Sequence, residues 1–364
     1  MERALSLAER AGGATAPNPM VGCVIADADG RVLGEGYHHR AGEPHAEILA
    51  LAMAREGGHD VRGATVVVSL EPCAHHGRTP PCVDALVAAG VGRVVYGIED
   101  PDVGGGGAAR LEAAGIPAET DVRSGEAELL VEPWLHFVRT GRPFFHLKSA
   151  ITLNGRVTRG ARGPRRITGE AAERAVHRLR RRHPAVVIGI GTALADDPLL
   201  TARAWPAVAA DEAMPWPDVQ PLRVVLDSKL RLGLDSRLVA TAGESPVLVM
   251  AGENADPARA AALARRGVEV LGVKAGESGL DLRAVAGLLA DRGVTGALVE
   301  PGPTLASGFL GAGLADRWTF FIAPVYDPAD DALPLSLGDG DPLELADPLW
   351  GSHGRDVSVS GRPR

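Results

Sequence analysis

Four residues in the first quarter of the chain have the types and the order of a catalytic zinc site. His45 and Glu47 stand at the start of a predicted helix, and Cys73 directly follows a predicted strand. Cys82 lies nine positions after Cys73. One imidazole and two thiolates provide three ligands for tetrahedral zinc and leave the fourth position for water, which is typical of catalytic rather than structural sites.

Glu47 is placed to move protons rather than to bind the metal. It lies two positions after His45, where its carboxylate can face a water molecule on the zinc. Because two thiolates formally neutralise the charge of the metal, we expect the pKa of that water to stay above the ~7 of the most favourable zinc sites. A carboxylate is then needed to take the proton and deliver it to the leaving nitrogen.

The order His-x-Glu, Pro-Cys and Cys is the signature of zinc-dependent deaminases. The alternative is a surface histidine with two unrelated cysteines, but every part of the signature occurs in order after the expected kind of element. Cys23 lies in the apolar run 21–25, so we expect it in the core rather than at the metal. A non-catalytic scaffold held together by zinc would have no reason to keep Glu47.

Composition excludes several other functional classes. The chain has 364 residues, 45% of them hydrophobic, which is enough for about two domains. Its net charge of -8 argues against binding to nucleic acid or to an acidic membrane surface. No apolar run approaches the ~18 residues of a membrane span, and the first residues lack the pattern of a signal peptide. We therefore expect a cytoplasmic enzyme that acts on a small molecule, without nucleic-acid or membrane partners, and that forms a homo-oligomer.

Alternating helix and strand patterns surround the candidate site and predict a layered α/β domain. Apolar residues at helical spacing predict helices over 2–11, 46–55, 82–89 and 108–114. Apolar, β-branched runs predict strands over 20–26, 31–37, 64–70 and 92–98. The sequence Asp27-Ala28-Asp29-Gly30 between the first two strands is typical of a hairpin turn.

The pattern loosens between Val122 and Pro143, and we expect the boundary between domains 1–142 and 143–364 there. A second α/β series follows, with predicted strands at 144–151, 185–190, 222–226, 246–250, 268–271, 297–299 and 318–322. Its predicted helices lie around 170–182, 257–266, 281–292 and 304–312. We expect the proline-rich stretch 203–221 to be a surface loop, and the tail from Pro324 to be irregular until 356–360.

The spacing of the two cysteines and the sequence around them narrow the class further. Eight residues separate Cys73 from Cys82, whereas most zinc deaminases have two there. The informative stretches are Pro17-Asn18-Pro19 with Val21-Gly22, Gly36-Tyr37-His38, Pro44 to Glu47, Leu70 to Cys73, and His75 to Cys82. In these stretches the chain resembles the bifunctional deaminase–reductases of riboflavin biosynthesis. The resemblance implies a cytidine-deaminase-like, three-layer α/β/α domain that deaminates the pyrimidine ring of a diaminopyrimidinone carrying a phosphoribosylamino group.

By the same resemblance, Asn18 and His38 contact the pyrimidine ring or its amine. Considered without the resemblance, Asn18 could cap a turn beside its prolines, and His38 could simply end a strand. His75 and His76 lie between the two cysteines. They are either solvent-facing loop residues or substrate contacts.

The resemblance continues through the second half of the chain. The matching stretches are Leu147-Lys148, Gly155-Arg156, Ile167 to Gly169, His177 with Leu179-Arg180, Gly191-Thr192, Asp196 to Pro198 with Thr201 and Arg203, and Val299-Glu300. They imply a domain similar to dihydrofolate reductase, which uses NADPH to reduce the ribose of the deaminated product to a ribityl chain.

The resemblance also implies roles for residues of this second domain. The implied roles are substrate binding for Arg180, Arg203 and Glu300, and NADPH binding for Thr192, Asp196 and the loop 302–308 that begins at Gly302. Arginine suits a substrate phosphate by its charge and its forked donor geometry. We expect the other arginines of the run 178–182 to form the solvated face of a helix.

Four positions depart from the family pattern. Asn154 stands where the family has Asp, Pro164 and Arg166 replace Ser and Trp, and Pro301 replaces a glycine. Proline removes a backbone donor, and arginine in place of tryptophan removes a stacking surface but adds a charge. The alternative interpretation is therefore a deaminase whose reductase domain is degenerate, silent or specialised.

Overall fold

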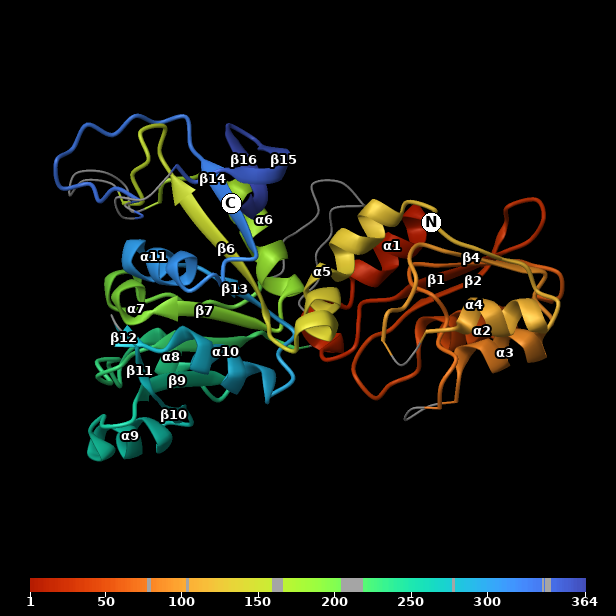
Figure 1. Cartoon of the computed structure of the whole chain (residues 1–364), viewed down its shortest axis with the longest axis horizontal. Helices are drawn as coiled ribbons and strands as arrows, with labels where there is room; N and C mark the ends of the chain where they lie inside the picture. The colour runs from red at the N-terminus through yellow and green to blue at the C-terminus, as the bar shows by residue number, and fades with distance from the viewer. Residues whose placement is uncertain are drawn as a thin grey trace. The chain divides into compact units, whose positions relative to one another are not determined.

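Two compact units, Met1–Gly141 and Arg142–Arg364, make up the chain in the computed structural model (Figure 1). The structure describes residues 1–76, 80–102, 105–158, 166–203, 219–276, 279–335, 337 and 342–364. Each unit has a sheet and a hydrophobic core of its own. Within the described ranges, no helix is both long enough and apolar enough to cross a membrane.

The sheet of the first unit has the strand order β2-β1-β3-β4-β5. Its strands are β1 (Gly22–Ala26), β2 (Val32–Tyr37), β3 (Thr65–Val68), β4 (Arg93–Tyr96) and β5 (Ala118–Glu119). β1 runs antiparallel to β2 and β3, whereas β3, β4 and β5 are parallel. The predicted hairpin is confirmed: the Asp27 carboxylate accepts hydrogen bonds from the amides of Asp29 and Arg31, and Gly30 has a φ of +82°.

Helices cover both faces of this sheet and produce three layers (Figure 1). One face packs against α2 (Ala46–Glu56), α3 (Cys82–Ala89) and α4 (Gly107–Ala113). The other face packs against α1 (Glu2–Glu9), which a short 3-10 helix at Gly12–Thr15 follows, and α5 (Ser124–Thr140). Side chains of β1 alternate between the faces, since Cys23 and Ile25 join the α2 side and Val24 the α1 side. The α/β/α arrangement expected from the sequence is confirmed.

The segment expected to be loose, Val122 to Pro143, is mostly a helix, so that prediction was wrong. α5 has 17 residues and contains Pro133. The residues that it buries are Ala127, Leu130, Val131, Trp134 and Leu135. Their spacing of three and four positions forms one apolar stripe, and packing of that stripe outweighs the backbone hydrogen bond that proline removes.

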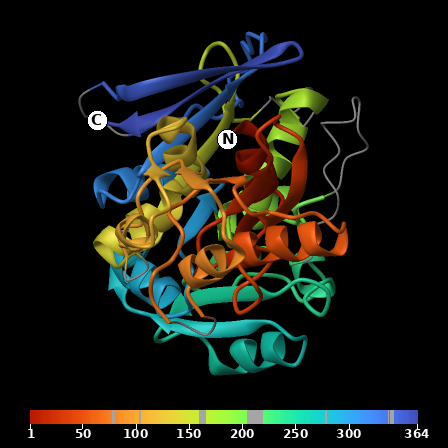
Figure 2. The same ribbon diagram turned by 90° about the vertical axis from the view of Figure 1, so that its right-hand side faces the viewer.

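The sheet of the second unit has the order β10-β9-β8-β7-β13-β6-β14-β16-β15. Its strands are β6 (Phe144–Ile151), β7 (Ala185–Gly189), β8 (Leu222–Leu226), β9 (Val247–Gly252), β10 (Glu269–Val273), β13 (Gly296–Val299), β14 (Arg317–Ile322), β15 (Leu345–His353) and β16 (Asp356–Pro363). The strands from β10 to β14 in this order are parallel, and the antiparallel hairpin β15–β16 adds to β14 (Figure 2). β11 (Ala275–Gly276) and β12 (Gly279–Leu280) pair as a separate two-stranded antiparallel sheet.

Two hydrophobic clusters fill the space between this sheet and its helices. α10 (Leu282–Ala290) and α11 (Pro303–Gly311) pack on one face, and α7 (Ile190–Asp196), α8 (Arg237–Ala240) and α9 (Pro257–Ala264) on the other. Residues of β7 divide between the two clusters, since Val187 faces the first and Val186 and Ile188 the second. α6 (Glu170–Arg182) packs through Ala172, Ala175 and Val176 against Phe321 of β14.

Two expectations for the second unit need correction. The tail contains β15, which was expected to be irregular: its sequence does not alternate, Asp347 has a φ of 48°, and pairing with β16 forms the strand. The strand predicted to run to residue 190 ends at Gly189, because Ile190 begins α7. Most of the predicted loop 203–221 lies outside the described residues.

Candidate active sites

Three side chains of the first unit meet at one place. His45 occupies the N-cap position of α2, Cys82 is the first residue of α3, and Cys73 lies in the loop after β3. Nδ1 of His45 is 3.6 Å from Sγ of Cys73 and 3.3 Å from Sγ of Cys82. All three candidate ligand atoms lie within 4.8 Å of one another. The fold thus brings the three predicted metal ligands together.

Glycines in β2 let α2 lie close enough to the sheet to place His45. A Cβ atom on Gly36 would lie 2.8 Å from the carbonyl oxygen of Ala46, and one on Gly34 would lie 2.2 Å from that of Ala50. Such distances are too short for a Cβ atom, so a larger residue at either position would push the helix away.

Glu71 fixes the loop that contains Cys73. Its buried carboxylate accepts hydrogen bonds from the amides of Asp100 (3.0 Å) and Ala108 (2.8 Å). The amide of Cys82 also donates to Sγ of Cys73, at 3.3 Å. These contacts tie the two cysteines to each other and to the start of α4.

The two thiols cannot both ionise by themselves. Hydrogen bonding to Cys82, with His45 adding to it, lowers the pKa of Cys73 to about 4 although burial opposes the change. The hydrogen bond with Cys73 and burial raise the pKa of Cys82. A divalent cation among the three side chains would stabilise both thiolates, and one imidazole with two thiolates is a ligand set typical of zinc. The donor set therefore fits a zinc ion.

Glu47 lies beside this cluster in the first turn of α2. The residue is 3% exposed, and burial raises the pKa of its carboxyl group. A hydrogen bond with the Cys82 side chain places the carboxyl group next to the candidate ligands. A carboxyl group with a raised pKa is a better proton acceptor than an ordinary carboxylate, which suits a general acid–base group. Cys23, 0% exposed, lies in the core as predicted.

Asn18 and His38 lie together next to the candidate ligands. Nδ2 of Asn18 is 3.2 Å from Nε2 of His38, and Nδ1 of His38 is 3.1 Å from the carbonyl oxygen of Pro44. This pattern assigns the ring proton to Nδ1, which donates to Pro44, while Nε2 accepts from Asn18. Burial lowers the pKa of His38, so the ring is neutral at pH 7. The rings of His38 and His45 are 5.3 Å apart between centroids.

His75 and His76 remain apart from this group. Both are exposed, and the group of candidate metal ligands among the described residues does not include them. The next residues of the loop, 77–79, are outside the described part of the chain. The two roles considered for His75 and His76, solvent-facing residues or substrate contacts, therefore stay predictions.

A largely shielded ionic group, with side chains 13–15% exposed, lies after β13 in the second unit. Glu300 accepts from Nε (2.6 Å) and Nη2 (3.1 Å) of Arg180 on α6. Nζ of Lys148, on the adjacent strand β6, is 3.6 Å from the same carboxylate. Burial alone would raise the pKa of Glu300, but Arg180 and Lys148 overcome this and lower it to about 2. One ionised carboxylate thus faces two cations, which leaves the group with a net positive charge.

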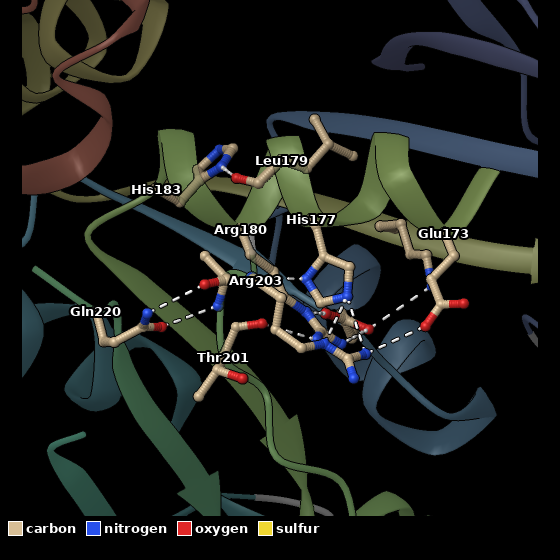
Figure 3. A network of polar contacts seen from close by, with 11 residues as sticks. Glu173, His177, Leu179, Arg180, His183, Thr201, Arg203 and Gln220 are labelled. Atoms are coloured by element: carbon tan, nitrogen blue, oxygen red, sulfur yellow. Dashed lines mark hydrogen bonds and ion pairs between the residues drawn. The ribbon is translucent and has the colours of Figure 1, made fainter. Parts of the chain in front are cut away.

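Arg203 belongs to a neighbouring network (Figure 3). Its amide donates to Nδ1 of His177 at 3.1 Å, and its guanidinium lies against Nε2 of the same ring, with Nε at 3.1 Å and Nη2 at 3.0 Å. Nη2 also pairs with Glu173 at 3.1 Å. Arg180 donates to the carbonyl oxygen of Thr201 at 3.3 Å, which links the two arginines through a short stretch of chain.

Glu173 and His177 were not among the site residues predicted from the sequence. The signal that could have found them is helical spacing, because Glu173, His177 and Arg180 are four and three positions apart and therefore share a face of α6.

Thr192 and Gly302 belong to two helices that begin at neighbouring strands. α7 follows β7 directly, Gly302 is the N-cap of α11 after β13, and β7 and β13 pair in parallel. A Cβ atom on Gly302 would lie 3.6 Å from Oγ1 of Thr192. The structure thus brings these two predicted cofactor residues together. Asp196, the third, is exposed at the other end of α7.

Three of the four departures from the family pattern are described by the structure. Asn154 donates through Nδ2 to the carbonyl oxygen of Asp327 at 2.8 Å, while its Oδ1 accepts from the Asp327 amide at 3.1 Å. An aspartate could not donate the first of these bonds. Arg166 is exposed and pairs with Glu173, and Pro301 removes a donor directly before the N-cap of α11. Pro164 lies outside the described residues.

Comparisons with known proteins match both halves. Residues 143–326 match the family model of the RibD C-terminal domain, and residues 1–98 match the cytidine and deoxycytidylate deaminase zinc-binding region. The riboflavin biosynthesis protein RibD of Escherichia coli is 42% identical over 329 residues, which cover 89% of this chain and 86% of that protein. The chain belongs to the RibD family.

Solved structures of RibD proteins agree with this assignment over the whole chain. The structure of Acinetobacter baumannii RibD has a TM-score of 0.80 and 35% identity, and covers 100% of this chain and 97% of its own. The Thermotoga maritima diaminohydroxyphosphoribosylaminopyrimidine deaminase/5-amino-6-(5-phosphoribosylamino)uracil reductase has a TM-score of 0.81 and 33% identity, with the same coverage.

Membership in the RibD family confirms the predicted enzyme class. The chain is a bifunctional enzyme of riboflavin biosynthesis, with a zinc-binding deaminase domain of the cytidine-deaminase type and a reductase domain that uses NADPH. It acts on a small molecule. The predicted fold class, two cofactors and two activities are therefore confirmed.

Proposed function

We propose that the chain catalyses two consecutive reactions on one phosphoribosylaminopyrimidine. The first is hydrolytic deamination of the pyrimidine ring, and the second is reduction of the ribose to a ribityl chain. The Thermotoga maritima relative, which is named as a deaminase and reductase, supports this pair of reactions. The observation on which the proposal chiefly rests is the convergence of His45, Cys73 and Cys82 on one point, with Glu47 beside them.

For deamination, His45, Cys73 and Cys82 would hold zinc, which when bound supplies Lewis-acid activation of water. The Glu47 carboxylate takes a proton from the attacking water and delivers it to the departing amine, because its buried position favours the protonated form. A carbon–oxygen bond forms, the carbon–nitrogen bond breaks and ammonia leaves. Asn18 and the neutral His38 orient the pyrimidine ring, since their hydrogen bonds to each other and to Pro44 fix both side chains.

For reduction, Arg180 and Arg203 would bind the substrate phosphate. The Glu300 carboxylate stays ionised between Arg180 and Lys148, so it can accept hydrogen bonds from substrate hydroxyl or amine groups. Thr192, Asp196 and the loop that begins at Gly302 would hold NADPH, which supplies the hydride. The close approach of Gly302 to Thr192 fits this role, because a site without a side chain lets a cofactor reach the backbone.

A deaminase with a silent or specialised reductase domain is the second candidate. Pro301 favours it, because a donor is missing directly before the N-cap of α11. The ionic group of Lys148, Arg180 and Glu300 favours a reductase that still works. We therefore expect slow but measurable NADPH oxidation with a raised requirement for the cofactor.

The zinc ligands are tested by metal analysis of purified variants. We expect one zinc ion per chain, and we expect Cys73→Ser and His45→Ala to lose both the metal and the release of ammonia. Cys23→Ala, which changes a core cysteine of the same domain, should keep the metal. Active protein without zinc would contradict the ligand assignment.

We further propose that the protein works in the cytoplasm as a homo-oligomer with separable domains 1–142 and 143–364. A reducing compartment keeps the thiols of Cys73 and Cys82 available for metal. The edge strand β15 exposes Leu349 and Trp350, which a second copy of the chain could cover. Light scattering on the purified protein tests the oligomeric state, and a monomer at all concentrations would contradict it.

A further inference from the structure

We infer that His177 is a positioning residue of the reductase domain: its neutral imidazole fixes the guanidinium of Arg203 in the orientation that receives the substrate phosphate. The inference rests on the proposed role of Arg203. It assigns a role to a residue that itself lies too deep to meet the substrate, since His177 is 1% exposed.

The described contacts of the His177 ring include the segment 201–203, where the ring hydrogen-bonds with the backbone of Thr201 and lies against Arg203. The Arg203 amide approaches Nδ1 at 3.1 Å, and the Arg203 side chain approaches Nε2 through both Nε and Nη2. The two nitrogens of one imidazole therefore face a fixed donor of the backbone and a movable donor of the side chain (Figure 3). The ring determines both where residue 203 lies and which way its guanidinium points.

The ring has to be neutral to make these contacts. An imidazolium would place an N–H group opposite both donors of Arg203, whereas neutral imidazole offers one acceptor. Burial, with the charges of Arg180 and Arg203, lowers the pKa of His177 to about 4. Because one ring nitrogen keeps its proton, only one of the two can accept a hydrogen bond from Arg203. The inference requires this acceptor to be Nε2, where the guanidinium lies, with the proton on Nδ1; the backbone of Thr201 also hydrogen-bonds with this ring.

Glu173 completes the arrangement on the other side of Arg203. It pairs with Nη2 of Arg203 and also with Arg166, whose side chain is 74% exposed. The Arg203 side chain, 40% exposed, therefore stands between an imidazole inside the protein and a carboxylate near its surface. Without the imidazole, Glu173 would be the guanidinium's partner among its described contacts, and one ion pair leaves a long side chain many rotamers.

Two substitutions of His177 distinguish whether the ring orients the Arg203 side chain or only supports the Arg203 backbone. The amide of Asn reaches the position of Nδ1, so His177→Asn can keep the contact with the Arg203 amide. The amide of Gln reaches the position of Nε2, so His177→Gln can keep the contact with the guanidinium. The readouts are kcat and KM for 5-amino-6-(5-phosphoribosylamino)uracil, and the inhibition constant of inorganic phosphate against that substrate.

We expect His177→Asn to raise both KM and the phosphate inhibition constant about tenfold or more, with kcat nearly unchanged, because a hydrogen bond to a charged group is lost in the ground state and the transition state alike. His177→Gln should stay within about threefold of the wild type. The KM for NADPH should be the same in all three proteins, which shows that the domain is folded.

The opposite result overturns the inference. If His177→Asn behaves as the wild type and His177→Gln does not, the ring only supports the backbone. The inference also fails if both variants raise the KM for the substrate equally, if neither raises it, or if only His177→Asn fails to fold. Arg203→Gln separates this failure from failure of the proposed function: if it leaves the phosphate inhibition constant unchanged, Arg203 does not bind phosphate at all.

Discussion

Glu47 and Glu300 are both glutamates, but the pKa of the Glu47 carboxyl group is raised and that of Glu300 is lowered. Glu47 is buried and the Glu300 side chain is only 13% exposed, and burial alone raises the pKa of a carboxyl group. At Glu47 burial dominates, and the pKa is raised although His45 opposes the change. Arg180 and Lys148 flank Glu300 and lower its pKa to about 2. The first carboxyl group can therefore exchange protons, while the second remains an anion that binds.

Because Glu47 is proposed to transfer protons and not to bind zinc, its substitution should impair catalysis without affecting metal binding. Glu47→Gln should keep one zinc ion per chain, since the carboxylate is not a candidate ligand. Release of ammonia should fall by a factor of about 100 or more, as is usual for loss of a general acid–base group. Metal content and ammonia are measured on the same sample. Full activity in this variant would remove Glu47 from the mechanism.

The low pKa of Glu300 predicts how stability depends on pH. Because its pKa falls from 4.5 to about 2 on folding, the contribution to stability is present above pH 4.5 and is lost as the pH falls toward 2. Glu300→Gln should remove up to about 3 kcal/mol at pH 7 and flatten the dependence between these values. The exposed Glu253→Gln is the control, and unfolding curves at several pH values provide the measurement. Equal curves for wild type and Glu300→Gln would contradict the ion pairs.

At the scale of elements, the strands and helices around the zinc cluster were predictable from the sequence. Apolar periodicity marked β1, β2, β3 and β4 and the helices α2 and α3. α5 was missed because local breakers such as Pro133 do not reveal that a packed stripe compensates for them. β15 was missed because its partner strand, not its own residues, makes it a strand.

The residues of the candidate sites also differ in whether the sequence could predict them. The metal ligands and Glu47 form a spacing motif that short stretches of sequence contain. The partners of Arg203 depend on which face of α6 meets the loop at 201–203, which only the folded chain shows. The two hydrogen bonds between Asn154 and Asp327 join residues 173 positions apart, so no local pattern could explain the asparagine.

Restoring the family residues at positions 301 and 166 should improve the binding of NADPH. Pro301 removes a backbone donor, and Arg166 replaces an aromatic surface. We expect Pro301→Gly combined with Arg166→Trp to lower the KM for NADPH about tenfold or more, which corresponds to regaining about one good contact. The assay is the loss of NADPH absorbance with the deaminated substrate supplied directly. Each single variant is a control, and an unchanged KM in the double variant would show that these positions do not limit cofactor binding.

At the scale of the whole molecule, the two units should work separately. A chain that ends at Arg142 keeps the complete first unit, including α5, and should fold, bind zinc and deaminate. A chain that ends at Arg123 lacks α5 and exposes the apolar face that packs against Trp134, so we expect it to be insoluble. If the longer chain is insoluble, or soluble and inactive with zinc bound, the domains depend on each other.

The most direct test of the account is to supply the full-length protein with the phosphoribosylamino-diaminopyrimidinone and NADPH and to measure both reactions in one vessel. We expect one ammonia released and one NADPH oxidised per substrate consumed, with chromatography showing a product that contains a ribityl chain. The oxidation should lag behind the deamination, because the second reaction uses the product of the first. Release of ammonia without any oxidation of NADPH, and with the ribose ring intact in the product, would contradict the assignment of two working active sites to this chain.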